Sequence, residues 1–297
     1  MTAAMPVWRS MLYVPVHVER FVASAQKSGA DCIQLDLEDS VPDAHKAEAR
    51  TRVAAAARLM KAAGADVVVR INRPLSLAVR DIEAAVGPDV DAFSVPKVDG
   101  AGHLRLLDEL VGEVEQQKGL PVGRTRLIAL IETAAGWQDM AAIAKASPRL
   151  VAMNLGSEDF AFDCGMEPLP EALLAPKQQL VIAARAAGLM PLGLIGSMSD
   201  MADDEGFRAV VRRSRQFGFV GASCIHPRHV PALNALFSAS EDEVAQAQRV
   251  VSALEEARRA GRGAASLDGR MVDAAHEVRA RRILDQAAVL RARRPPP

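Results

Sequence analysis

The chain has 297 residues, of which 49% are hydrophobic and only 4% aromatic, and 36 Lys and Arg residues balance 37 Asp and Glu residues. This composition excludes an intrinsically disordered chain and a basic nucleic-acid binder. No apolar segment reaches the roughly 18 residues that span a bilayer, and residues 1–10 lack the apolar core of a secretory signal. We therefore expect a cytoplasmic globular protein that binds neither membrane nor nucleic acid.

The three cysteines, Cys32, Cys164 and Cys224, lie far apart in the sequence. None belongs to a C-x-x-C pair, which argues against a disulfide scaffold and against a cysteine zinc site.

Short apolar runs alternate with Ala-rich segments of helical spacing. The runs that we expect to form strands are residues 11–15, 32–37, 67–71, 92–96, 127–131, 150–155, 191–195 and 219–225. The expected helices are 19–28, 44–63, 103–118, 137–146, 170–187 and 204–217, with helix stops at Gly29, Gly64, Gly119, Gly188 and Gly218. Strands that alternate with helices indicate a parallel sheet, and eight such units predict a (β/α)8 TIM barrel. An open doubly wound sheet is the alternative, but the first strand is not followed by a glycine-rich turn.

The pattern changes after Phe237. Residues 240–260 are expected to form one helix with Ser240 as its N-cap. Residues 264–273 are expected to be extended or a turn, and residues 277–290 to form a last helix. We therefore expect a TIM-barrel catalytic domain over residues 1–238 and a C-terminal helical extension over 239–297. That extension either packs on its own barrel or reaches a neighbouring subunit.

Polar side chains follow most of the expected strands. They include Asp36, Glu38, Asp39, Arg70, Lys97, Glu132, Asp159 and His226. Because catalytic groups of such barrels sit at the carboxyl ends of the strands, we expect these residues to converge on one rim. Clustered carboxylates without cysteine or paired histidine favour Mg²⁺ over Zn²⁺, and an arginine beside them suits a carboxylate substrate. Taken singly, each of these charges is more typical of a helix cap or a surface residue than of a catalytic group, and the joint pattern is stronger than its members.

Seven motifs occur in an order that resembles one known family. They are residues 9–15 (RSMLYVP), 35–39 (LDLED), 69–72 (VRIN), 95–98 (VPKV), 129–133 (ALIET), 156–159 (GSED) and 224–227 (CIHP). Together they resemble the citrate lyase beta-subunit-like proteins of the aldolase/citrate lyase family, which includes malyl-CoA and citramalyl-CoA lyases. The chain differs from residues common in that family at Val16, Gly193 and Ala222, on the side of the site expected to hold the thioester.

The resemblance implies a set of site residues. Glu132 and Asp159 would bind Mg²⁺, and Arg70 would bind the substrate carboxylate. Arg9, Lys97, Glu38 and Asp39 would line the site. Residues 267–273 (LDGRMVD) resemble a lid that enters a neighbouring subunit's site in the lyases, which implies a homotrimer or hexamer with Asp273 as the catalytic acid/base.

The implied reaction is a reversible, Mg²⁺-dependent cleavage of a β-hydroxyacyl-CoA thioester into acetyl-CoA and a small 2-keto acid. Three alternatives remain at this point. They are a malyl-CoA thioesterase on the same metal site, a metal aldolase that needs no CoA, and a non-catalytic subunit of a lyase complex.

Overall fold

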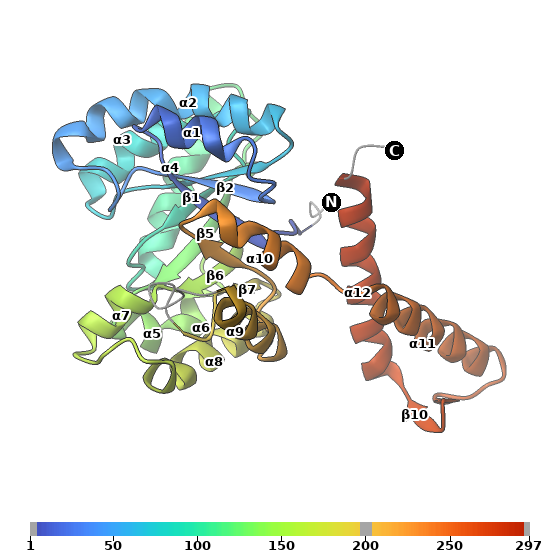
Figure 1. Ribbon diagram of the computed structural model, residues 1–297. Helices are drawn as coiled ribbons and strands as arrows, with labels where there is room; N and C mark the ends of the chain where they lie inside the picture. The colour runs from blue at the N-terminus through green and yellow to red at the C-terminus, as the bar shows by residue number, and fades with distance from the viewer. Residues whose placement is uncertain (1–4, 197–203, 294–297) are drawn as a thin grey trace. The chain divides into compact units, whose positions relative to one another are not determined.

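The computed structural model describes residues 5–196 and 204–293 (Figure 1). The chain divides into two compact units, Met1–Phe237 and Ser238–Pro297, which are described separately.

The first unit is built on a sheet of eight strands. The strands are β1 (Ser10–Pro15), β2 (Cys32–Asp36), β3 (Asp66–Arg70), β4 (Ala92–Val95), β5 (Arg126–Ile131), β6 (Leu150–Leu155), β7 (Met190–Leu192) and β8 (Ala222–Cys224). Their order is β7-β6-β5-β4-β3-β2-β1-β8, and every pair is parallel. A parallel bridge between Leu192 and Gly221 joins the two ends of the sheet. The predicted (β/α)8 barrel is confirmed.

Helices surround the barrel. They are α1 (Glu19–Ala25), α2 (Lys46–Ala62), α3 (Leu75–Ala85), α4 (Ala101–Gln117), α5 (Ala134–Gln138), α6 (Met140–Ile143), α7 (Ser157–Asp163), α8 (Pro170–Ala186), α9 (Asp204–Gln216) and α10 (Val230–Leu236), with short 3-10 turns at Asp43–His45 and Pro227–His229. All five predicted glycine stops have a positive φ, the conformation that ends a helix. The expected helix over 137–146 is instead two short helices, α5 and α6, which meet at Asp139.

Helix α3 was not predicted. Its buried face contains Asp81, which interrupts the apolar spacing that marks a helix in a sequence. Asp81 is fully buried and accepts hydrogen bonds from Arg50 Nε at 2.7 Å and from Asn72 Nδ2 at 2.7 Å. A buried carboxylate with these partners is satisfied, although the sequence alone does not reveal them.

Alternation along the strands decides which side chains face the barrel axis. One apolar cluster includes Met11, Cys32, Val68, Ala92, Ile128 and Ala152, which come from six adjacent strands and fill the barrel interior. Since successive residues of a strand point to opposite faces, steps of two from these positions lead to the polar residues Tyr13, Asp36, Arg70, Glu132 and Asn154. The strand period therefore brings these polar residues to the inner side of the carboxyl rim.

Trp8 closes the opposite end of the barrel. Its side chain is buried in the interior cluster, and its Nε1 donates to Asp66 Oδ2 at 2.8 Å. Gly221 crosses directly over the backbone of Trp8. A Cβ on Gly221 would stand 1.8 Å from the carbonyl oxygen of Trp8, so no larger residue fits where the barrel closes.

The second unit consists of α11 (Glu241–Arg259), a hairpin of β9 (Ala265–Leu267) and β10 (Arg270–Val272), and α12 (Ala274–Arg293). Ser240 and Glu243 form a capping box at the start of α11, which confirms the predicted N-cap. The unit has a small core of its own, formed by Ala247, Val250, Leu254, Val272 and Ala280. The segment expected to be extended or a turn is this hairpin.

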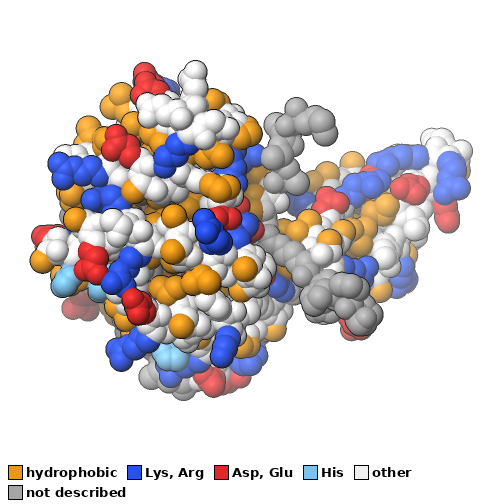
Figure 2. All heavy atoms as spheres, turned by 90° about the horizontal axis from the view of Figure 1, so that it is seen from above, with side chains coloured by type: hydrophobic (Ala, Val, Ile, Leu, Met, Phe, Trp, Pro, Cys, Tyr) orange, Lys and Arg blue, Asp and Glu red, His pale blue; other side chains and the backbone are white. Residues whose placement is uncertain are grey.

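The face of the barrel unit drawn in Figure 2 carries side chains of both charges among hydrophobic ones, without a large patch of one sign. This mixture agrees with the net charge of −1. Within residues 5–196 and 204–293, no helix has the length and apolar character that a membrane crossing requires.

Replacing Gly221 by alanine should destabilise the protein by at least about 2 kcal/mol, because the added methyl overlaps the Trp8 carbonyl and the backbone must shift. The measurement is urea unfolding followed by circular dichroism. Gly102→Ala is the control: Gly102 lies inside α4 with no atom within 4 Å of an added Cβ. That variant should be neutral or slightly stabilising, and equal losses in both variants would contradict the prediction.

Candidate active site

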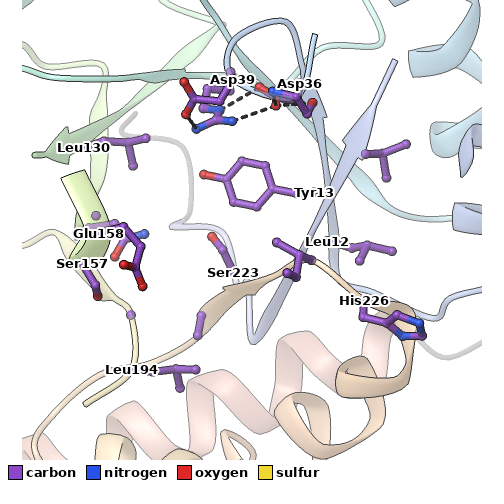
Figure 3. A pocket seen from close by; sticks show the side chains of 18 of the residues that line it. Leu12, Tyr13, Asp36, Asp39, Leu130, Ser157, Glu158, Leu194, Ser223 and His226 are labelled. Atoms are coloured by element: carbon purple, nitrogen blue, oxygen red, sulfur yellow. Dashed lines mark hydrogen bonds and ion pairs between the residues drawn. The ribbon is translucent and has the colours of Figure 1, made fainter. Parts of the chain in front are cut away.

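A cavity of about 830 Å³ opens at the carboxyl ends of the strands. Figure 3 shows Tyr13 pointing into its middle, with Asp36 and Asp39 above it in this view and Ser157 and Glu158 to its left. Charged and polar groups in its wall are Tyr13, Ser24, Asp36, Asp39, Ser40, Arg70, Glu132, Asn154, Ser157, Glu158, Asp159, Lys177, Ser223 and His226. Apolar residues of β1, α1 and the β8 end complete it, among them Leu12, Phe21 and Ile225.

Arg70 is held by three acidic side chains. Its Nε and Nη2 each donate to one oxygen of Asp36 at 2.7 Å, a bidentate pair. Its Nη1 donates to Asp39 Oδ2 at 2.9 Å and lies 2.8 Å from Glu38 Oε2, in ion-pair contact without hydrogen-bond alignment. The guanidinium carbon also lies 4.8 Å from the centre of the Tyr13 ring. The arginine is thus fixed in position at the end of β3.

The same arginine affects its acidic partners differently. Burial would raise the pKa of Asp36, but hydrogen bonds from Arg70 and Ser40 outweigh it and hold that pKa below its usual value. For Glu38 burial wins, and its pKa rises to about 7 despite the nearby charges of Arg70 and Lys97. Glu38 is therefore a carboxyl group that exchanges a proton near neutral pH.

Glu132 and Asp159 form the second acidic group of the cavity. Glu132 is buried, its Oε2 accepts the backbone N–H of Lys97 at 2.7 Å, and burial raises its pKa, with the charge of Asp159 adding to the effect. The ammonium of Lys97 lies 3.5 Å from Asp159 Oδ2 and 3.3 Å from Glu38 Oε1. Lys97 thus links the two acidic groups of the site.

Lys97 has an unusual backbone. Its φ is 47°, in the left-handed region that non-glycine residues rarely adopt. Arg73 Nε donates to the Lys97 carbonyl at 3.0 Å, and Glu132 accepts the Lys97 N–H, so contacts on both sides hold this conformation. Strained residues of this kind cluster at functional sites.

The structure brings most of the expected site residues together, namely Arg70, Lys97, Glu38, Asp39, Glu132 and Asp159. Arg9 is not among them. It precedes β1, at the amino end of the barrel, where its side chain pairs with Asp31 through two contacts of 2.7 Å and donates to the Asn234 carbonyl. Arg9 therefore does not line this cavity, and we leave it out of the proposed site.

Asp273 belongs to the second unit, directly before α12. Its Oδ1 accepts the backbone N–H of Ala275 at 3.0 Å and lies 2.7 Å from His276 Nδ1. The hydrogen bond from His276 lowers the pKa of Asp273. Asp273 is thus both a carboxylate at neutral pH and an N-cap of α12.

Asp36, Tyr13 and Lys177 are among the cavity residues that received no role from the sequence. Asp36 is the last residue of β2. Because alternate residues of a strand face the same side, counting in steps of two from the inward-facing Cys32 places Asp36 at the inner side of the rim. Tyr13 is the only tyrosine of the chain. In a chain so poor in aromatic residues, a tyrosine within the first expected strand could have been singled out as a candidate site residue. Lys177 is separated from the motifs along the chain and carries no such signal.

Comparison with known proteins defines the class. The family model described as HpcH/HpaI aldolase/citrate lyase matches residues 9–227, and the chain belongs to that family. A second model, described as a C-C bond lyase of the TIM-barrel fold, matches residues 181–290. These matches confirm the resemblance found in the sequence and the predicted class of enzyme, a carbon–carbon lyase.

Individual relatives agree with this class. The chain is 35% identical to the citrate lyase subunit beta of Leuconostoc mesenteroides subsp. cremoris, over 94% of this chain and 93% of the relative. It is 36% identical to the L-malyl-CoA/beta-methylmalyl-CoA lyase of Cereibacter sphaeroides, over 94% and 92%. Among solved structures, CitE of Mycobacterium tuberculosis in complex with magnesium, acetoacetate and coenzyme A matches with a TM-score of 0.70 and 29% identity, over 97% of this chain and 100% of that one.

Asp36→Asn should destabilise the protein by about 3 kcal/mol, because it removes the buried carboxylate that pairs with the largely buried guanidinium of Arg70 through two hydrogen bonds. Asp39→Asn is the matched control. The Asp39 side chain is 57% exposed although it binds the same arginine, so its loss should cost at most about 1 kcal/mol. Urea unfolding at pH 7 measures both changes, and equal losses would show that burial does not set the strength of this cluster.

Glu38→Gln should make the protein's stability less dependent on pH. The Glu38 carboxyl keeps its proton up to about pH 7 in the folded state, whereas the unfolded chain releases it near the ordinary glutamate pKa of 4.5. Between these two values the folded state binds more protons, so the group's ionisation lowers stability as the pH rises, by at most about 1.4 kcal/mol per pH unit. Glutamine does not titrate. The free energy of unfolding, measured at pH 4.5, 6 and 8, should therefore rise for the variant relative to the parent as the pH rises. A difference between the two proteins that does not change with pH would refute the raised pKa of Glu38.

Proposed function

We propose that this protein reversibly cleaves a β-hydroxyacyl thioester of coenzyme A, of the malyl-CoA or citramalyl-CoA type, into acetyl-CoA and a small 2-keto acid, and that it requires Mg²⁺. The observation that carries the proposal is one cavity that contains both a fixed arginine and a buried carboxylate beside a second one. Relatives named for malyl-CoA and citrate lyases, and a structural neighbour crystallised with magnesium, acetoacetate and coenzyme A, support this choice.

The donor set of Glu132 and Asp159 fits Mg²⁺. Two carboxylates with water and substrate oxygens satisfy this ion. The described residues contain no group of three or more potential metal-binding side chains, so the other ligand positions would go to water and substrate. Burial and the charge of Asp159 both raise the pKa of Glu132, and positive charge beside the pair relieves this cost. When bound, Mg²⁺ supplies that positive charge next to the substrate's hydroxyl and carboxylate oxygens.

Arg70 binds the carboxylate of the keto-acid part. Asp36 occupies its Nε and Nη2 and fixes the plane of the guanidinium, while its other edge contacts the exposed Asp39. A substrate carboxylate that displaces Asp39 would keep the arginine paired throughout. Lys97 lies just behind the cavity wall, with its ammonium 3.5 Å from Asp159, so its positive charge adds to that of Arg70 on this side.

Asp273 exchanges the proton with the carbon that becomes the methyl group of acetyl-CoA. In the cleavage direction this carbon must gain a proton, and in the condensation direction it must lose one. The lowered pKa of Asp273 favours the carboxylate, the form that removes the proton. We propose that Asp273 reaches the cavity of a neighbouring subunit in a homotrimer or hexamer.

A second candidate is a subunit of a larger lyase complex. The beta-subunit names of several relatives favour it. A malyl-CoA thioesterase and an aldolase without CoA are two further outcomes of the same experiment, because their products differ.

The test is a panel of malyl-CoA, methylmalyl-CoA, citramalyl-CoA and citryl-CoA with Mg²⁺, with keto acid and acetyl-CoA measured separately from free hydroxy acid and CoA. Asp273→Asn should slow cleavage by roughly a hundredfold or more. Thermal unfolding should be unchanged, since asparagine caps a helix as well as aspartate does. Full cleavage by Asp273→Asn would remove this residue from the mechanism, and free malate with CoA would identify a thioesterase. Turnover of none of the thioesters would favour the non-catalytic subunit.

Mixing variants tests the assembly. Asp273→Asn and Glu132→Gln should each be inactive alone. If the acid/base comes from a neighbouring subunit, unfolding and refolding the two together should restore part of the activity, because some mixed sites then contain both native residues. Failure to complement in an oligomer shown by light scattering to be mixed would place Asp273 in the site of its own chain.

A further inference from the structure

Lys177 is a buried amine that the proposed lyase reaction does not use. It lies on α8, it is 2% exposed, and its Nζ makes three short contacts: 2.7 Å to Ser157 Oγ, 2.6 Å to the Leu194 carbonyl and 2.6 Å to the Gly196 carbonyl. Both Lys177 and Ser157 line the cavity. Figure 3 shows Ser157 at the cavity wall, between Glu158 and Leu194.

The three contacts permit two arrangements of protons. A charged ammonium would donate to all three oxygens. A neutral amine would donate to the two carbonyls and accept the hydroxyl proton of Ser157, because it has two N–H groups and one lone pair. The Ser157 hydroxyl has a second acceptor in the Gly196 carbonyl, but that contact is longer, at 3.4 Å against 2.7 Å to Lys177 Nζ. The heavy atoms are the same in both cases, and the proton can pass between Ser157 and Lys177 without any movement of the chain.

The surroundings favour the neutral amine. Lys177 has no ion-pair partner in the described part of the chain, and the elements that pack most extensively against α8, which are α6, β6 and β7, contain no charged residue. The helix that holds Ser157, α7, carries Glu158, Asp159 and Asp163, and none of them is within ion-pair distance of Lys177. Glu158 on α7 is the charged group that acts on it, and only weakly opposes the effect of burial. Burial therefore lowers the pKa of Lys177 to about 7.

The serine lies beside the proposed lyase site. Gly156, one residue before Ser157, packs against Glu132 so closely that a Cβ there would stand 2.6 Å from Glu132 Oε1. Ser157 and Glu132 line the same cavity, so an acyl group bound there lies in the space that the Ser157 side chain borders. A hydroxyl within hydrogen-bond reach of a base, with that base oriented by further contacts, is the arrangement of an activated nucleophile. Serine–lysine pairs are a known variant of it.

We propose that Ser157 and Lys177 form a nucleophile–base pair that hydrolyses short acyl thioesters and activated esters bound in the cavity, without a metal. This activity differs from the lyase reaction and from a thioesterase on the Mg²⁺ site. Ser157 Oγ attacks the acyl carbon while its proton moves to Lys177 Nζ. The carbon–sulfur bond breaks, and the leaving thiolate takes that proton.

Water completes the cycle. It gives a proton to Lys177 and attacks the acyl-serine ester, the bond between Ser157 Oγ and the acyl carbon breaks, and the proton returns from Lys177 to Ser157. One thioester and one water thus give one carboxylic acid and one thiol, without any redox change.

The test uses p-nitrophenyl acetate with the full chain in excess EDTA, following the burst of p-nitrophenolate and locating the acetyl group by peptide mass spectrometry. The parent should be acetylated on Ser157, with a burst rate that rises to a plateau as the pH passes about 7, where Lys177 loses its proton. Ser157→Ala should slow the burst by roughly a hundredfold or more.

Lys177→Arg separates catalysis from structure. Arginine keeps the hydrogen-bond donors but stays charged and cannot act as a base near neutral pH, so its burst should fall as far as that of Ser157→Ala. Ser223→Ala is the matched control, since Ser223 lines the same cavity and no hydrogen bond to a lysine is present there among the described residues. It should keep the burst.

Acetylation confined to other residues, or a full burst in Lys177→Arg, would overturn the proposal. Lys177 would then have only a structural role, binding the Leu194 and Gly196 carbonyls. If thermal unfolding shows that Lys177→Arg does not fold, the Ser157→Ala burst and the mapped acetyl group still decide. The result is independent of the lyase panel, because EDTA removes the metal that cleavage requires. A burst without carbon–carbon cleavage would count against the proposed lyase function alone.

Discussion

The active end of this barrel depends on the pairing of Arg70 with acidic side chains at the ends of neighbouring strands. A guanidinium at the inner end of β3 cannot be buried alone, and Asp36 on β2 meets it with two hydrogen bonds of 2.7 Å. β2 and β3 are hydrogen-bonded neighbours in which Asp36 lies directly opposite Arg70. The register of these two strands therefore fixes the position at which a substrate carboxylate can bind.

Charge compensation extends from this pair across the cavity. Glu38 contacts Arg70 and Lys97, and Lys97 contacts Asp159 while its backbone N–H binds Glu132. Glu38 and Asp159 are held by cations and Glu132 by a backbone N–H of the same lysine, so a change at Lys97 affects both acidic groups. The left-handed backbone of Lys97 is part of this arrangement, because it lets one residue serve Glu132 with its N–H and Glu38 with its side chain.

Much of this could be predicted from the sequence because the barrel repeats one simple pattern. Runs of aliphatic residues predicted all eight strands, and polar residues at the ends of these runs predicted which side chains lie at the carboxyl rim. Arg9 was misplaced for a reason that the pattern itself explains. Arg9 borders a strand just as Arg70 does, but it lies before β1, at the amino end of the barrel, where Asp31 pairs with it, whereas Arg70 is the last residue of β3. Asp81 and Lys177 are satisfied by partners distant in the chain, and no local pattern records such partners.

The site contains buried carboxyl groups and a buried amine, and burial shifts their pKa values in opposite directions. Burial raises the pKa of Glu38 and Glu132 and lowers that of Lys177. The acidic side therefore gains from positive charge, whether from Lys97 or from a divalent ion, whereas the lysine side gains from losing its charge. Added positive charge at Glu132 would also favour the neutral form of Lys177, since like charges repel. The metal site and the serine–lysine pair are thus electrostatically compatible, and one cavity can hold both without a conflict of charge.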